Sequence, residues 1–113
     1  MLADRIKAIL TREVLGGQVR FMSYGEFGKL HGLPKDTRGW ANKLVLDAVA
    51  RQCLQDPSLE GLDLTYLLRS GETLYPGVVD GRPFEASRRQ VLRCREIAQA
   101  IIDRFSPGTT NPY

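Results

Sequence analysis

The sequence predicts a mainly α-helical domain with one β-hairpin, and three observations favour this fold class. A short segment with helix start and stop residues is followed by a turn and a longer apolar-periodic segment, all within 23–54. A stretch over 62–68 alternates apolar and polar residues, as a half-buried strand does. The segment over 85–105 repeats apolar residues at three- and four-residue steps, which is typical of an amphipathic helix.

The first predicted helix covers 3–15, where apolar residues recur at helical spacing until Gly16 and Gly17 end it. The next begins at Tyr24, because Ser23 and Glu26 form a capping box in which the serine hydroxyl accepts from a backbone N–H. Gly32 ends this short helix. Leu33 and Pro34 then form an extended turn, since a residue before proline avoids the helical region.

The third predicted helix covers 37–54 and is capped by Asp36 or Thr37. Its expected buried stripe consists of Trp40, Leu44, Val45, Ala48, Val49 and Cys53.

A hairpin is predicted next, with strands over 62–68 and 73–79 joined at Ser70 and Gly71. Arg69 and Glu72 then lie near its tip. Asp80 and Gly81 turn the chain again before the last helix. Two helices joined by a turn and followed by a hairpin have the order of a winged helix-turn-helix, here with an added N-terminal helix and a long C-terminal helix.

Length and composition favour one folded domain. The chain has 113 residues, 42% of them apolar, and a net charge of +3. We expect a single domain over 1–105 and a flexible C-terminal tail over 106–113, which is rich in Pro, Gly, Thr and Asn.

No apolar run approaches the roughly 20 residues of a membrane span, and the first residues do not resemble a secretory signal. We therefore expect a cytoplasmic protein without a membrane partner.

Residues suited to catalysis are few. The single histidine, His31, ends a short helix beside Gly32 and is more typical of a surface or capping residue. Cys53 and Cys94 have neither metal-ligand spacing nor a CxxC arrangement, so we expect buried thiols and no metal or other cofactor. A thiol enzyme that uses one of them is a minor alternative.

The helix-turn-helix segment carries the residues expected to bind DNA. Ser23 and Tyr24 stand at a helix N-terminus, where hydroxyl and N–H groups can hold a phosphate. Arg38 opens the next helix, with Asn42 one turn later, and such positions reach bases in this type of motif. The expected DNA-binding residues are Ser23, Tyr24, Lys35, Thr37, Arg38, Asn42, Lys43, Arg69 and Arg82. In the alternative interpretation, Tyr24 packs in the core and Arg38 pairs with Glu26 or Asp36.

The segment over 19–44, and more loosely on to 81, resembles the C-terminal DNA-binding domain of alkylguanine-DNA alkyltransferases and alkyltransferase-like proteins. The matching residues are Ser23-Tyr24-Gly25-Glu26-Phe27-Gly28, then Gly32 and Pro34, then Arg38 and Leu44. The resemblance implies that the second helix enters the minor groove of double-stranded DNA. It also implies that Tyr24 presses on a phosphate and that Arg38 takes the place of a flipped base.

The chain departs from this family at the reactive centre. The family's Pro-Cys-His-Arg-Val motif is absent, and the corresponding stretch reads LDLTYLLRS. We therefore expect a DNA-binding protein that is not an enzyme. The alternative is a small protein-interaction module, a regulator or inhibitor of a nucleic-acid-processing protein, which could also form a homodimer through its C-terminal helix.

Overall fold

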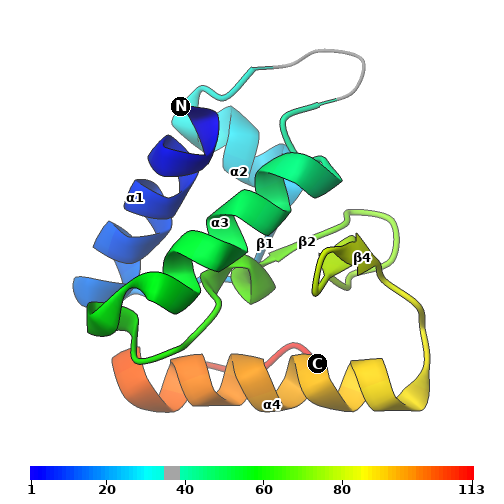
Figure 1. Cartoon of the computed structure of the whole chain (residues 1–113). Coiled ribbons are helices and arrows are strands. Elements are labelled where there is room, and N and C mark those ends of the chain that lie inside the picture. Colours follow the sequence, from blue (N-terminus) through cyan, green and yellow to red (C-terminus); the bar gives the residue numbers. More distant parts are fainter. Residues whose placement is uncertain (35–38) are drawn as a thin grey trace.

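The computed structural model describes residues 1–34 and 39–113, and Figure 1 shows their arrangement. The helices are α1 (Leu2–Leu15), α2 (Tyr24–His31), α3 (Lys43–Gln55) and α4 (Arg88–Phe105), with 3-10 turns η1 (Pro57–Leu59) and η2 (Leu64–Leu67). The strands are β1 (Met22–Ser23), β2 (Leu68–Arg69), β3 (Val78–Val79) and β4 (Arg82–Pro83).

Helices form two sides of the molecule around a central apolar core. α1 and α3 lie side by side, while α4 crosses the opposite side beneath η2 and the strands (Figure 1). Each of these helices presents fully buried residues inward, including Ile6, Val49 and Ile101. The apolar face of α4 is covered within the chain, since Cys94, Ala98, Ile101 and Ile102 are all buried.

The boundaries of α1 and α2 are confirmed. Ser23 Oγ accepts from Glu26 N at 3.1 Å and donates to Glu26 Oε1 at 3.2 Å, so Ser23 caps α2 as predicted, with the Glu26 carboxylate bonded to the serine hydroxyl. Gly32 ends α2 in the left-handed conformation, with φ of 64°. Only glycine adopts this conformation without a steric penalty, which explains the stop.

The predicted start of the third helix is wrong. Positions 36–38 lie outside the described residues, but 39–42 are not helical, and Asn42 caps a helix that begins at Lys43. Asn42 Oδ1 accepts from Val45 N at 3.1 Å. The buried stripe shifts with this start: Leu44, expected inside, is 82% exposed, while Leu46 is buried beside Val49 and Cys53.

The predicted strand over 62–68 is largely a 3-10 turn. Asp63 caps this turn, since its Oδ1 accepts from Thr65 N at 2.9 Å and from Thr65 Oγ1 at 2.6 Å. Every residue from Leu64 to Leu68 is buried, so the alternation in the sequence does not correspond to two faces. Only Leu68 and Arg69 are extended, and they pair in parallel with Met22 and Ser23.

The hairpin also lies elsewhere than predicted. β3 pairs antiparallel with β4 around Asp80 and Gly81, whose φ angles of 54° and 73° suit a tight two-residue turn. Arg69 is therefore not at a hairpin tip, because it belongs to the parallel pair β1–β2. α4 begins at Arg88 rather than at 85, because Ser87 Oγ accepts from Gln90 N at 3.2 Å.

The segment over 106–113, expected to be a flexible tail, lies against the domain in the structure. Tyr113 Oη donates to the Tyr66 carbonyl at 3.1 Å. Its ring stacks on Tyr75, with centroids 5.8 Å apart, and meets the edge of Phe21 at 6.0 Å. These contacts join the end of the chain to the core between α4 and η2.

Both cysteines are free, buried thiols. Burial raises the pKa of Cys53 to about 12 and that of Cys94 to about 11. A thiol that stays protonated and inaccessible is a poor nucleophile.

We predict that neither thiol of the native protein reacts readily at pH 8. A chromogenic disulfide reagent should label both cysteines only after denaturant is added, because reaction requires opening of the core. Rapid labelling of one thiol in the native protein would contradict this burial and would support the thiol-enzyme alternative.

We also predict a loss of stability in alkali. An ordinary thiol ionises near pH 8.5, so the unfolded chain releases protons that the folded one retains up to about pH 11–12. The contribution is complete below pH 8 and is lost as the pH rises toward 12. Chemical denaturation at pH 8, 9 and 10 should show a falling free energy of unfolding. A Cys53→Ala, Cys94→Ala variant should show a weaker decline.

Candidate nucleic-acid interface

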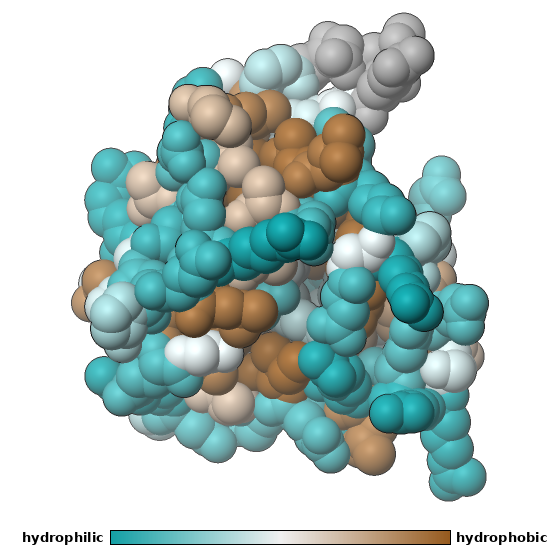
Figure 2. Space-filling view, viewed as in Figure 1, coloured by the Kyte–Doolittle hydropathy of each residue, from teal (hydrophilic) through white to brown (hydrophobic). Residues whose placement is uncertain are grey.

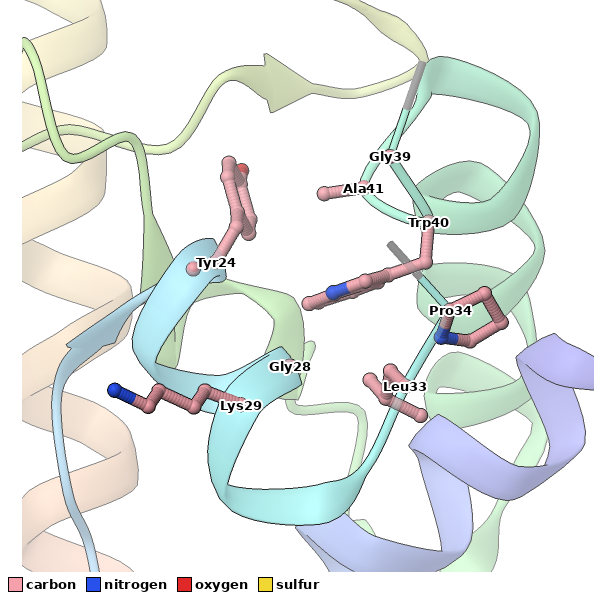
Figure 3. Close-up of a pocket in the computed structure, with 9 residues that line it drawn as sticks. Tyr24, Gly28, Lys29, Leu33, Pro34, Gly39, Trp40 and Ala41 are labelled. Carbon is pink, nitrogen blue, oxygen red and sulfur yellow. The ribbon is translucent and has the colours of Figure 1, made fainter. Parts of the chain in front are cut away.

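The indole of Trp40 lies directly on Gly28 of α2, as Figure 3 shows. A β-carbon at position 28 would come within 2.4 Å of Trp40 Nε1, so only glycine fits there without movement. Phe27 lies 5.6 Å from the Trp40 ring, centroid to centroid, and Tyr24 meets it edge-on at 5.9 Å. This contact fixes the chain that leads into α3 against α2.

Tyr24 links α2 to the segment before the hairpin. Its hydroxyl oxygen accepts from Gly77 N at 2.7 Å, and burial raises the pKa of the phenol above its ordinary value. The ring packing agrees with the alternative interpretation of this residue as a core tyrosine. The hydroxyl hydrogen can still donate to a further acceptor such as a phosphate oxygen.

A pocket of about 330 Å³ opens beside this aromatic contact. Tyr24, Leu33, Pro34 and Trp40 give it mainly apolar walls, and Lys29 lines its edge with its ammonium group pointing away from Trp40 (Figure 3).

Ser23 and Asn42 both serve as helix caps. The Ser23 hydroxyl is used at the start of α2, and Asn42 Oδ1 is used at the start of α3. Since Asn42 precedes the helix, it does not lie one helical turn beyond Arg38 on a shared face. The direct contribution of Ser23 and Asn42 in this structure is to orient α2 and α3.

The structure brings Lys43 and the β3–β4 hairpin to the same side of α3. Lys43 occupies the first turn, and Asp47 follows one turn later. A β-carbon at Gly81 would lie 3.1 Å from Asp47 Oδ1, so the hairpin turn rests closely on α3. Arg82, the first residue of β4, follows Gly81 directly and so lies beside this contact between the hairpin and α3. Lys43 and Arg82 are exposed, and neither forms an ion pair with any residue of 1–34 or 39–113.

The remaining predicted residues divide into two groups. Arg69 is half-buried in β2 and pairs with Ser23, apart from the hairpin. Lys35, Thr37 and Arg38 lie outside the described residues.

Sequence reasoning missed Leu44 as an exposed residue of this surface. It is 82% exposed in the first turn of α3, next to Lys43. Recognising Asn42 as the helix cap would have placed Lys43 and Leu44 in the exposed first turn. Figure 2 shows several separate apolar areas on an otherwise mostly polar face.

The described residues hold no group of three or more His, Cys, Asp or Glu side chains arranged to bind a metal ion. None of the helices described is long and apolar enough to span a membrane. No family model matches the chain, and neither a curated protein nor a solved structure is detectably similar to it.

We predict that Gly28→Ala displaces the Trp40 side chain. The added methyl group overlaps the indole, so the free energy of unfolding should fall by about 1–3 kcal/mol, and Trp40 fluorescence should shift to the red as the ring meets water.

Gly25→Ala is the matched control in the same helix. Its β-carbon would meet only Ser23 Oγ, at 3.9 Å. It should be neutral or stabilise by up to about 1 kcal/mol, since alanine favours helix. Equal effects of the two substitutions would contradict the close contact at Gly28.

Proposed function

We propose that this is a non-enzymatic DNA-binding protein in which the first turn of α3 and the β3–β4 hairpin contact the duplex together. The observation that supports this most directly is the pair of exposed cations, Lys43 and Arg82, on neighbouring elements of one side. Each lacks an ion-pair partner among the described residues. Phosphates attract such groups, and counterion release makes the contact favourable.

The close approach of the hairpin to α3 strengthens the proposal. Because Gly81 lies against Asp47, the hairpin and the helix start form one surface and can meet a duplex at once. A helix beside a short hairpin is also the arrangement of a winged helix, and we propose that the domain is a variant of that fold. In this variant the hairpin turns at Asp80 and Gly81.

Leu44 fits the same interface. Leu44 is the most exposed leucine of the described residues, at 82%, and apolar side chains serve as wedges between base steps in minor-groove binding. The resemblance to alkyltransferases adds Arg38 as the proposed inserted residue.

The protein-interaction module remains the second candidate, and the exposed Leu44 favours it too. The α4 homodimer has less support, because the apolar face of α4 is buried within the chain. Duplex binding and its salt dependence separate the two candidates.

We predict that fluorescence anisotropy detects binding of the chain to a short duplex, with affinity falling as salt rises. Lys43→Ala and Arg82→Ala should each reduce the slope of log K against log salt by about 0.9, the value for one phosphate contact on B-DNA. Arg12→Ala, which removes the same charge from the exposed end of α1, should leave the slope unchanged. No binding at low salt, or equal effects of all three substitutions, would contradict the proposed interface.

Insertion of Arg38 makes a separate prediction. The wild-type chain should bind a duplex with an abasic site more tightly than the intact duplex, because less stacking is lost there. Arg38→Ala should reduce this preference while retaining salt-dependent binding. An unchanged preference in the variant would exclude Arg38 as the inserted residue without excluding DNA binding.

A further inference from the structure

The start of α4 carries two further arginines beside the hairpin. In Figure 1 the start of α3, the hairpin and the start of α4 follow one another along one side of the molecule. Arg89 lines a hollow of about 300 Å³ together with Val79 and Asp80 of the hairpin, so α4 begins directly next to it. Arg88 precedes Arg89 in the first turn of the helix. Neither arginine is among the DNA-binding residues predicted from the sequence.

Arg88 and Arg89 differ from the other arginines of α4 in having no charged or carbonyl partner. Arg93 Nη2 lies 3.2 Å from Asp80 Oδ1. Arg104 pairs with Glu60 at the other end of the helix, and the Nε of Arg95 donates to a backbone carbonyl at 3.0 Å. The two arginines of the first turn are exposed and form no ion pair with any residue of 1–34 or 39–113.

The aspartates close to this side of the molecule are already neutralised. Asp80 of the hairpin turn is paired with Arg93, and Asp47 of α3 is paired with Arg51 at 3.1 Å. Glu85, between the hairpin and α4, is exposed and has no ion pair among the described residues. We call the unpaired cations on this side the cationic edge, which consists of Lys43, Arg82, Arg88 and Arg89.

The connection between the hairpin and α4 is held in place by its own contacts. Phe84 N donates to the Gly77 carbonyl at 3.0 Å, which continues the pairing of β3 with β4 by one step. The Phe84 ring stacks on Tyr75, with centroids 5.0 Å apart. Glu85 N donates to Gln90 Oε1 at 2.7 Å. The arginines of α4 are therefore held at a fixed place relative to Arg82, which reduces the entropy lost when all of them bind one partner.

We propose that the duplex contacted by α3 and the hairpin continues onto the start of α4, where Arg88 and Arg89 each bind a backbone phosphate. These contacts rest on the proposed function, since they extend the same interface. Arginine suits the role because its planar fork donates to phosphate oxygens in pairs. The longest dimension of the molecule is 36 Å, close to one helical turn of B-DNA, roughly 34–36 Å. A single turn of duplex can therefore cover the whole cationic edge.

The test is a salt series of fluorescence anisotropy on a duplex of about 14 base pairs, which exceeds one helical turn. Arg88→Ala and Arg89→Ala should each reduce the slope of log K against log salt by about 0.9, the value for one phosphate contact. Arg104→Ala makes the same change of net charge at the opposite end of α4 and should leave the slope unchanged. A full slope in either of the first two variants, or an equal reduction in all three, would overturn the contacts at α4.

Glu85 provides a test of the opposite sign. Its carboxylate repels phosphates that lie within a Debye length, about 10 Å at 0.1 M salt. Glu85→Gln should therefore tighten duplex binding about 2-fold at low salt. Asp103→Asn removes the same charge near the far end of α4 and should have no effect. Unchanged or weaker binding by Glu85→Gln would contradict a duplex lying over this end of the helix.

The possible outcomes separate these contacts from the proposed function. If Lys43→Ala and Arg82→Ala reduce the slope while Arg88→Ala and Arg89→Ala do not, the duplex ends at the hairpin and only the extension onto α4 fails. If the wild-type chain binds no duplex at low salt, both the extension and the proposed function fail. Equal affinity for a polyglutamate chain of the same charge would make an acidic protein the occupant and would overturn the extension.

Discussion

The contact between Trp40 and Gly28 is the constraint on which the arrangement of the proposed interface depends. A hydrogen atom at position 28 lets the indole lie on the backbone of α2, where Phe27 and Tyr24 surround it. Trp40 stands two residues before the α3 cap, so its position directs the first turn of that helix. Tyr24 extends the same constraint to the hairpin, because its hydroxyl accepts from Gly77 N just before β3. One buried junction therefore orients both elements.

This organisation separates two regions of the molecule with different chemistry. The start of α3 and the β3–β4 hairpin carry exposed, cationic side chains that suit a polyanion. A cavity between the end of α3, η2 and α4 is lined by the carboxylates of Asp63, Asp80 and Glu96 and by the guanidinium of Arg93. α3 links the two regions, with Lys43 at one end and Leu54 at the other, and Asp80 of the hairpin turn also lines the cavity.

Local sequence features predicted α1 and the bounds of α2 well, because a serine cap or a left-handed glycine acts within a few residues. Ser23, Glu26 and Gly32 therefore fix α2 as expected. The start of α3 was missed because Asp36, Thr37 and Asn42 are all acceptable caps, and the long-range contact of Trp40 with Gly28 favours the last. The strand over 62–68 was missed because the Asp63 cap favours a 3-10 turn and both sides of the segment are buried. Lys43 and Arg82 were predicted as binding residues, whereas the exposure of Leu44 depends on where α3 begins and how it packs.

The central claim is that the first turn of α3 and the hairpin act as one surface toward DNA. The most direct measurement is a ¹H–¹⁵N NMR titration of the chain with a short duplex at low salt. The account predicts that the amide signals of residues 42–47 and 78–82 shift together with one dissociation constant, while those of residues 8–15 in α1 stay unchanged. Shifts in only one of the two elements, or shifts confined to another part of the chain, would contradict it.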